Sequence, residues 1–224
     1  MAEFFPDAPD YRLRPLVEVP VEDTLSELKK LLPELPEQIS IWLDSRHMIP
    51  DTGSGGFAYA PDIINISFDE HFPDKAEQLK YLRGTIFHEG YHLVQGHTYE
   101  RPVHQYKTAL ENAVYEGCAT VFEREYAQVS PLWGDYSRHS DAQLSEWQEV
   151  MAQITKAQYE EPGSKLYPNW AFYDPTDKQR WKMYKTGAWI VDRVLKKSEK
   201  DIKELRLLSA QEILSICDEG IEQK

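Results

Sequence analysis

The chain has little cysteine, no long hydrophobic run and a deficit of positive charge. Its 224 residues include 2 cysteines, 25 lysines and arginines and 38 aspartates and glutamates, so the net charge is −13. Nucleic acids and anionic membranes are bound by concentrated lysine and arginine, and we expect neither as a partner. Because no apolar run approaches a membrane span and the first residues lack the regions of a signal peptide, we expect a cytoplasmic protein.

The two cysteines, Cys118 and Cys217, lie far apart and lack the paired spacing of a zinc ribbon or a redox motif. We expect both to be free, buried thiols. With 41% hydrophobic and 12% aromatic residues, the chain can bury one sizeable core. We therefore expect a single domain over residues 1–224, without repeats or long linkers.

Hydrophobic periodicity predicts an α+β fold in which a small sheet precedes a mainly helical body. Strands at Ile39–Leu43, Gly55–Tyr59 and Ile63–Phe68 form a mixed or antiparallel sheet within about 39–70. An amphipathic helix over Val21–Leu32 comes before it. Two active-site helices within about 74–127 and further helices within about 140–220 follow, predicted over 74–97, 103–127, 144–154, 178–197 and 210–218. The aromatic segment 161–175 reads as an irregular loop that borders a substrate cleft.

The first active-site helix carries the sequence His88-Glu89-Gly90-Tyr91-His92. Residues four apart share one face of a helix, so both imidazoles can converge on one divalent cation with Glu89 beside it. A core stripe at helical spacing is formed by Leu79, Leu82, Ile86 and Leu93. Both histidines project roughly opposite to this stripe. The pattern predicts a zinc-binding helix whose histidines line a cleft.

A catalytic zinc usually has three protein ligands, so a further histidine or glutamate is expected downstream. The metzincin pattern fails, because Gln95 and Thr98 stand where its glycine and third histidine would be. A polar histidine at a helix end is commonly structural, which disfavours His97. His104 and His139 have no stronger signal.

Glu111 and Glu116 compete for the third position on the second active-site helix. Their separation places them about 140° apart around a helix, so only one can face the metal. Glu111 has a spacing from His92 familiar from zinc aminopeptidases, but it falls near the helix start. Gly117 allows close approach of helix backbones beside Glu116. Polar residues that share the stripe of Glu116 are Asn112, Thr120 and Glu123. These neighbours favour Glu116 and leave Glu111 as the alternative.

The run 115–123 resembles the Glu-Gly-x-Ala segment of the gluzincin metallopeptidases, which follows their His-Glu-x-x-His helix. The resemblance implies that Glu116 is the third zinc ligand and selects it over Glu111. It also implies that Glu123 supports a histidine ligand. One departure is the gap of 23 residues between His92 and Glu116, which is longer than in the zinc aminopeptidases and implies a longer turn between the helices.

Residues from about 40 to 195 are also similar to a family of predicted cytoplasmic Zn-dependent proteases, mostly bacterial. The shared features are a Gly-Gly strand, here 55–58, and a late Tyr-x-x-Gly helix, here 184–191. These resemblances imply a zincin-like fold with the motif helix in the cleft. By the same motif match, Tyr184 stabilises the oxyanion of the reaction, with Tyr173 and Tyr167 as further candidates.

The hypothesis is therefore a zinc-dependent peptide-bond hydrolase that acts on a peptide or protein. His88, His92 and Glu116 would hold Zn²⁺, and Glu89 would be the general base. Zinc aminopeptidases of the gluzincin group bind the substrate amine with a strand glutamate. The strand Gly55–Tyr59 has no such acid, which favours an endopeptidase. Its edge offers a place for an extended substrate, although ordinary structural pairing explains the strand equally well.

Two other functions remain open at this point. One is a non-catalytic domain that retains zinc for folding and binds a protein partner. The other is a metal-dependent amidase or deformylase with a small substrate, which a closed pocket would favour. The sequence does not indicate the oligomeric state.

Overall fold

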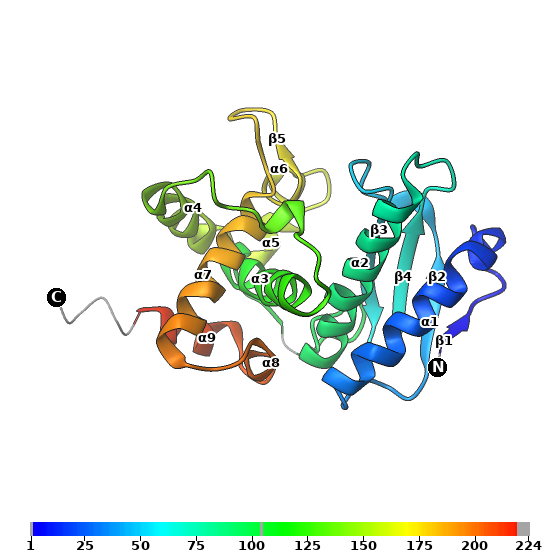
Figure 1. The fold of residues 1–224 in the computed structure, drawn as a ribbon. Helices are drawn as coiled ribbons and strands as arrows, with labels where there is room; N and C mark the ends of the chain where they lie inside the picture. Colours follow the sequence, from blue (N-terminus) through cyan, green and yellow to red (C-terminus); the bar gives the residue numbers. More distant parts are fainter. Residues whose placement is uncertain (1, 104, 219–224) are drawn as a thin grey trace. The chain divides into compact units, whose positions relative to one another are not determined.

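The computed structural model describes residues 2–103 and 105–218 and shows a mixed α/β fold, mainly helical with a small sheet (Figure 1). The chain divides into two compact units, Met1–His104 with Phe122–Val129, and Gln105–Val121 with Ser130–Lys224. Our expectation of a single domain stays a prediction. Within the described ranges, no helix combines the length and the apolarity needed to cross a bilayer.

The first unit contains a four-stranded mixed sheet in the order β1-β2-β4-β3. The strands are β1 (Ala2–Phe4), β2 (Ile39–Leu43), β3 (Ser54–Ala60) and β4 (Ile63–Phe68). β1 and β4 run parallel to β2, and β3 runs antiparallel to β4. The three predicted strands and the mixed sheet are confirmed. No local pattern indicates β1, because three residues are too few for hydrophobic alternation, and they form a strand only by pairing with β2.

Two long helices of this unit, α1 (Arg14–Leu31) and α2 (Lys75–Gln95), lie on one face of the sheet (Figure 1). α1 begins earlier than predicted and continues through Pro20. A proline inside a helix removes one hydrogen bond, from the carbonyl four residues earlier. That residue, Leu16, is 49% exposed, so water can satisfy its carbonyl, while the buried side chains of Val17 and Val21 continue across the proline.

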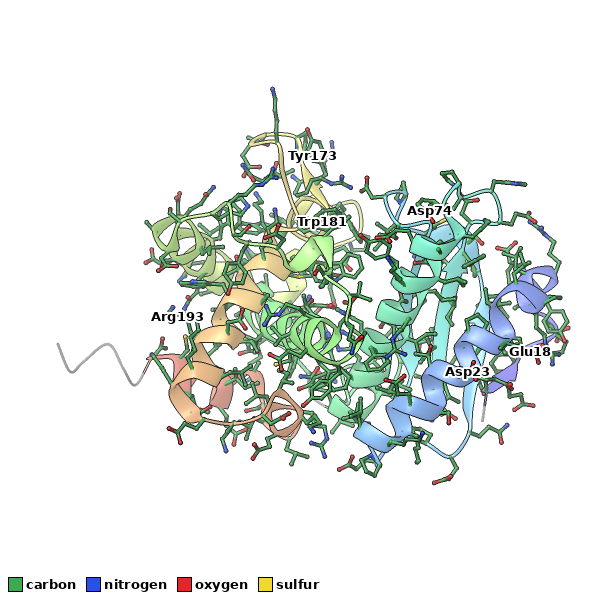
Figure 2. All side chains as sticks on the ribbon, in the orientation of Figure 1. Glu18, Asp23, Asp74, Tyr173, Trp181 and Arg193 are labelled. Carbon is green, nitrogen blue, oxygen red and sulfur yellow. The ribbon has the colours of Figure 1, made fainter. Side chains whose placement is uncertain are left out.

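Helix α2 has well-defined ends. Asp74, labelled at its start in Figure 2, accepts a hydrogen bond from the backbone N–H of Glu77 (3.0 Å), and Gly96 ends it with a φ of +74°. Only glycine adopts such a left-handed conformation without strain. The predicted helix is therefore confirmed, and its flanking residues explain where it stops.

The expected one-sided core stripe of α2 is wrong. Leu79 is 37% exposed, whereas every residue over 84–93 is buried. A Cβ atom at Gly90 would overlap the Leu28 side chain of α1, and one at Gly84 would overlap the Glu123 carboxylate. The helix is thus enclosed by the sheet, by α1 and by the last turns of a third helix, and a stripe on one face could not indicate this.

The remaining elements follow β4 and α2 in the chain. Three short 3₁₀ turns occur at Tyr11–Leu13, Ser45–His47 and Leu132–Gly134. The helices are α3 (Ala109–Tyr126), α4 (Asp141–Gln153), α5 (Lys156–Tyr159), α6 (Leu166–Ala171), α7 (Lys182–Ser198), α8 (Ile202–Leu205) and α9 (Ala210–Asp218). A hairpin of β5 (Tyr173–Asp174) and β6 (Gln179–Arg180) lies between α6 and α7. Both cysteines are free and buried, as predicted.

Three predicted boundaries in this part of the chain are wrong. α3 starts at Ala109 instead of Val103, because the Thr108 hydroxyl accepts a hydrogen bond from the Glu111 N–H (3.2 Å) and caps the helix. α7 starts at Lys182, since Trp181 has a φ of 57° and the residues before it form β6 (Figure 2). The segment 161–175 contains α6 and β5 and is not wholly irregular.

Candidate metal centre

Two buried histidines lie one turn apart on α2. The ring centroids of His88 and His92 are 4.8 Å apart, and the residues are 5% and 3% exposed. His88 Nδ1 lies 3.3 Å from Glu123 Oε2, and His92 Nδ1 lies 3.3 Å from Gln95 Oε1. With the proton on Nδ1, each ring donates to its neighbouring oxygen and its Nε2 keeps the lone pair. This tautomer is the one that ligates a metal through Nε2.

Glu116 approaches these histidines from α3. Glu123 contacts His88 from the same helix, and residues seven apart share one helical face, so Glu116 lies on the face that carries Glu123. The ligand atoms of His88, His92 and Glu116 lie within 4.8 Å of one another. Nitrogen and oxygen ligands bind zinc at about 2 Å. Small side-chain rotations would therefore let these three share one ion.

Glu111, the competing residue, has a structural role at the start of α3. Its Oε2 accepts a hydrogen bond from the Lys107 N–H (2.5 Å), and its Oε1 accepts one from Gln211 Nε2 (3.2 Å). Oε2 thus stabilises the helix start, and Oε1 links α3 to α9. Over the described part of the chain, Glu111 belongs to no group of potential metal ligands.

Glu89 is held beside strand β3. Its Oε2 accepts a hydrogen bond from the Ala58 N–H (2.8 Å), and the residue is 7% exposed. A Cβ atom at Gly56 would lie only 2.8 Å from Thr85 Cγ2 and 2.5 Å from the Asn65 carbonyl oxygen. Glycine at this position is therefore required for α2 to approach the strand closely enough for the Glu89–Ala58 bond.

A protein-family model described as "Predicted Zn-dependent protease (DUF2268)" matches residues 19–215. The chain belongs to this family. No curated protein and no solved structure matches the chain. The description agrees with the chemistry of the donor set, since two imidazoles and a carboxylate are typical zinc ligands. The resemblance to gluzincins stays a prediction.

The sequence did not indicate a role for Gln95, which was named only because the metzincin pattern has a glycine at its position. It is 2% exposed, and its Oε1 contacts His92 Nδ1. The spacing could have revealed it, because residues three apart on a helix are neighbours. Glu123 was expected to contact a histidine ligand, and its carboxylate does lie against His88.

No sequence pattern indicated Tyr106 and Tyr159, whose pKa values are affected by the charge of Glu116. Burial raises the pKa of Tyr106, and the negative charges of Glu160 and Glu116 raise it further. Burial likewise raises the pKa of Tyr159, with contributions from Tyr167 and Glu116. Both hydroxyls therefore stay protonated at neutral pH.

The other predicted site residues are distributed as follows. The His97 ring lies 4.9 Å from that of His92, but His97 is outside the group of three, and His104 lies outside the described residues. His139 lies 3.2 Å from both Gln143 Oε1 and Lys185 Nζ, which gives it structural contacts through both nitrogens.

The candidate oxyanion donors all come from α6, β5 and α7. Tyr184 is half-buried in the first turn of α7, whereas Tyr167 and Tyr173 are 37% and 48% exposed. The catalytic role of Tyr184 stays a prediction, as do those of the two alternatives.

Proposed function

We propose that this protein is a zinc-dependent endopeptidase in which His88, His92 and Glu116 hold Zn²⁺. The observation that carries the proposal is the approach of their ligand atoms to within 4.8 Å. Two further observations support it. Acceptors at Nδ1 prepare both histidines to ligate through Nε2, and the family is described as Zn-dependent protease.

The chemistry follows from the arrangement around Glu89. Zinc bound at this site would act as a Lewis acid and lower the pKa of water. Glu89 is the general base: it takes a proton from the attacking water and passes it to the leaving amine. Its hydrogen bond to the Ala58 N–H keeps the carboxylate beside β3. Tyr184 donates a hydrogen bond to the oxyanion that forms on the substrate carbonyl.

The edge of β3 gives the substrate backbone a place to bind. β3 is the last strand in the sheet order, and among the described residues its outer edge forms only an isolated bridge, between Ser54 and Ile49. Ser54 and Ala58 already use their outward carbonyls, which accept hydrogen bonds from Ile49 N–H (3.1 Å) and Tyr99 N–H (3.0 Å). Alternation places the N–H and C=O of Gly56 on the same edge.

Gly56 is half-buried, and no described residue forms a hydrogen bond with its outward groups. An extended peptide can therefore pair with Gly56 through two main-chain hydrogen bonds. This position lies next to Glu89, because Cγ of Glu89 is 3.6 Å from where a Gly56 Cβ would be. The substrate backbone would thus be held beside the general base.

Metal analysis of matched variants tests the ligand assignment. We expect the purified protein to hold zinc, Glu116→Gln to lose it, and Glu111→Gln to retain it despite a weakened start of α3. Measurement by atomic emission after dialysis against trace zinc distinguishes them. Loss of zinc only in Glu111→Gln would overturn the assignment.

A second variant separates binding from catalysis. Glu89→Gln keeps an oxygen that can accept from the Ala58 N–H, so zinc content should be unchanged, while peptide hydrolysis should fall by at least about 100-fold with the loss of the base. Unchanged turnover of a peptide library would refute the role of Glu89.

A further inference from the structure

Four aromatic rings gather around the part of β3 that lies beside Glu89. They are His47, Phe57, Tyr59 and Tyr99, and together they are called the aromatic patch. The Phe57 ring is in the middle, with its centroid 4.9 Å from His47, 6.2 Å from Tyr59 and 6.5 Å from Tyr99. Tyr59 and Tyr99 stack at 5.9 Å with their planes 26° apart.

The aromatic patch is open to solvent. Tyr99 is 75% exposed and Tyr59 is 38% exposed, His47 is exposed, and Phe57 is half-buried. A large part of the surface of these rings is in contact with solvent. Burying apolar surface is favourable by about 25 cal/mol per Å², so a ligand that covered the rings would gain free energy. A contiguous exposed apolar surface commonly marks a binding site.

Backbone hydrogen bonds and ring contacts connect the members of the aromatic patch. The backbone N–H of Tyr99 donates to the Ala58 carbonyl (3.0 Å), and that of Glu100 donates to the Tyr59 carbonyl (2.6 Å). Ring contacts then fix the side chains against one another. A ligand would therefore meet a prepared surface and lose little free energy in ordering it.

Hydrogen bonds connect the patch directly to the candidate active site. Ala58 donates its N–H to Glu89 and accepts from Tyr99 at its carbonyl, so one residue separates the general base from the patch. Gly56 and Ala58 face α2, and Phe57 between them faces the other side of the sheet. A peptide residue opposite Phe57 on a neighbouring strand would place its side chain about 5 Å from that ring.

We propose that the aromatic patch is a subsite for a large apolar side chain of the substrate, aromatic or long aliphatic. The side chain belongs to the residue adjacent to the one that pairs with Gly56. This inference rests on the proposed peptidase function and adds a substrate class to it. Residues with acidic side chains are disfavoured, because the faces of aromatic rings are electronegative and the chain carries a net charge of −13.

Peptide binding and peptide cleavage, measured side by side, test the subsite. Zinc-loaded Glu89→Gln is titrated with fluorescent, end-blocked octapeptides from a randomised library, and wild-type protein is used to cleave the same library. We expect one position to prefer Phe, Tyr, Trp or Leu over Ala by about 10-fold or more, as apolar subsites do. A preference for acidic or basic residues at that position, or no preference, would overturn the proposal.

The variant Tyr99→Ser removes the most exposed ring and keeps the backbone N–H that binds Ala58. We expect the Phe-to-Ala preference to fall several-fold. Phe172→Ser is the matched control, since Phe172 is another exposed aromatic residue (46%), and it should keep the full preference. An unchanged preference in Tyr99→Ser, or an equal loss in Phe172→Ser, would refute the assignment.

The two measurements distinguish the two proposals. If apolar peptides bind selectively to Glu89→Gln but wild type cleaves nothing, the subsite stands and the peptidase function falls. If wild type cleaves peptides without apolar preference, the subsite falls and the function stands. If no peptide binds or is cleaved, both are refuted.

Discussion

Replacing Glu123 with glutamine should weaken zinc binding while leaving the fold intact. The Glu123 side chain is fully buried, and its Oε2 lies 3.3 Å from His88 Nδ1. Glutamine keeps the shape and an acceptor oxygen but removes the negative charge that makes the imidazole a better ligand. Removing such supporting groups typically costs 10- to 100-fold in metal affinity, or about 1.4–2.7 kcal/mol.

Gln95, on α2, provides a comparison at the other histidine. Gln95→Leu removes a neutral hydrogen bond to His92, which contributes about 0.5–1.5 kcal/mol, so affinity should fall by roughly 2- to 10-fold. Gln95→Glu should instead strengthen zinc binding, because a carboxylate supports a ligating histidine better than an amide does. The amide nitrogen that it replaces has no described hydrogen-bond partner. Without zinc, this variant should be less stable, since it buries a charge.

The assay is competition for zinc with a chromophoric chelator, accompanied by thermal unfolding of the zinc-free proteins. The expected order of affinity is Gln95→Glu, wild type, Gln95→Leu and then Glu123→Gln. Equal affinities across the series, in variants that unfold like the wild type, would refute the idea that these side chains set the tautomers of the two histidines.

Two further predictions concern stability. Gly90→Ala should destabilise the protein by about 1–3 kcal/mol, because the added methyl group overlaps Leu28 of α1, and a urea titration measures the loss; an unchanged midpoint would contradict the close packing. Asp44→Asn should lower stability at pH 7 by about 1 kcal/mol, since asparagine keeps the cap of the turn that starts at Ser45 but loses the charge of the buried carboxylate that Arg46 binds. Hydrogen bonds from Arg46 lower the pKa of Asp44, so its contribution is present above about pH 4 and is lost as the pH falls through the folded-state pKa. Unfolding curves of the two proteins should therefore converge in acid, and a constant difference would exclude this linkage.

Local sequence patterns predicted the elements whose structure depends mainly on their own residues. The alternating Ile-rich strand β4 and the helix α9 have the predicted bounds. α2 was predicted to within two residues at each end, because Asp74 and Gly96 are strong start and stop signals. β1 and the continuation of α1 through Pro20 depend on neighbours distant in sequence, and no local pattern indicates them.

In the candidate site, too, local patterns predicted some features and not those that depend on the packing of distant segments. The spacing of His88 and His92 follows from helix geometry, and the order of motifs selected Glu116, whose carboxylate groups with both imidazoles as a potential metal ligand. The bond between Glu89 and Ala58 could not be predicted, because it depends on how the sheet register and the helix position combine. The enclosure of α2 on several sides was also missed, since its signal consists of two glycines whose partners lie on other helices.

Helix α3 would link zinc binding to folding, because it carries both a candidate ligand and the residue that contacts another. Glu116 and Glu123 share one face, and Glu123 is held against His88. The start of the helix is fixed by Thr108 and Glu111, so its register is determined at both ends. A one-residue shift of α3 would rotate both carboxylates away by about 100°. A metal that binds only the correctly placed helix stabilises that placement by its own binding free energy. The ion would therefore keep α3 in register as well as serve the chemistry.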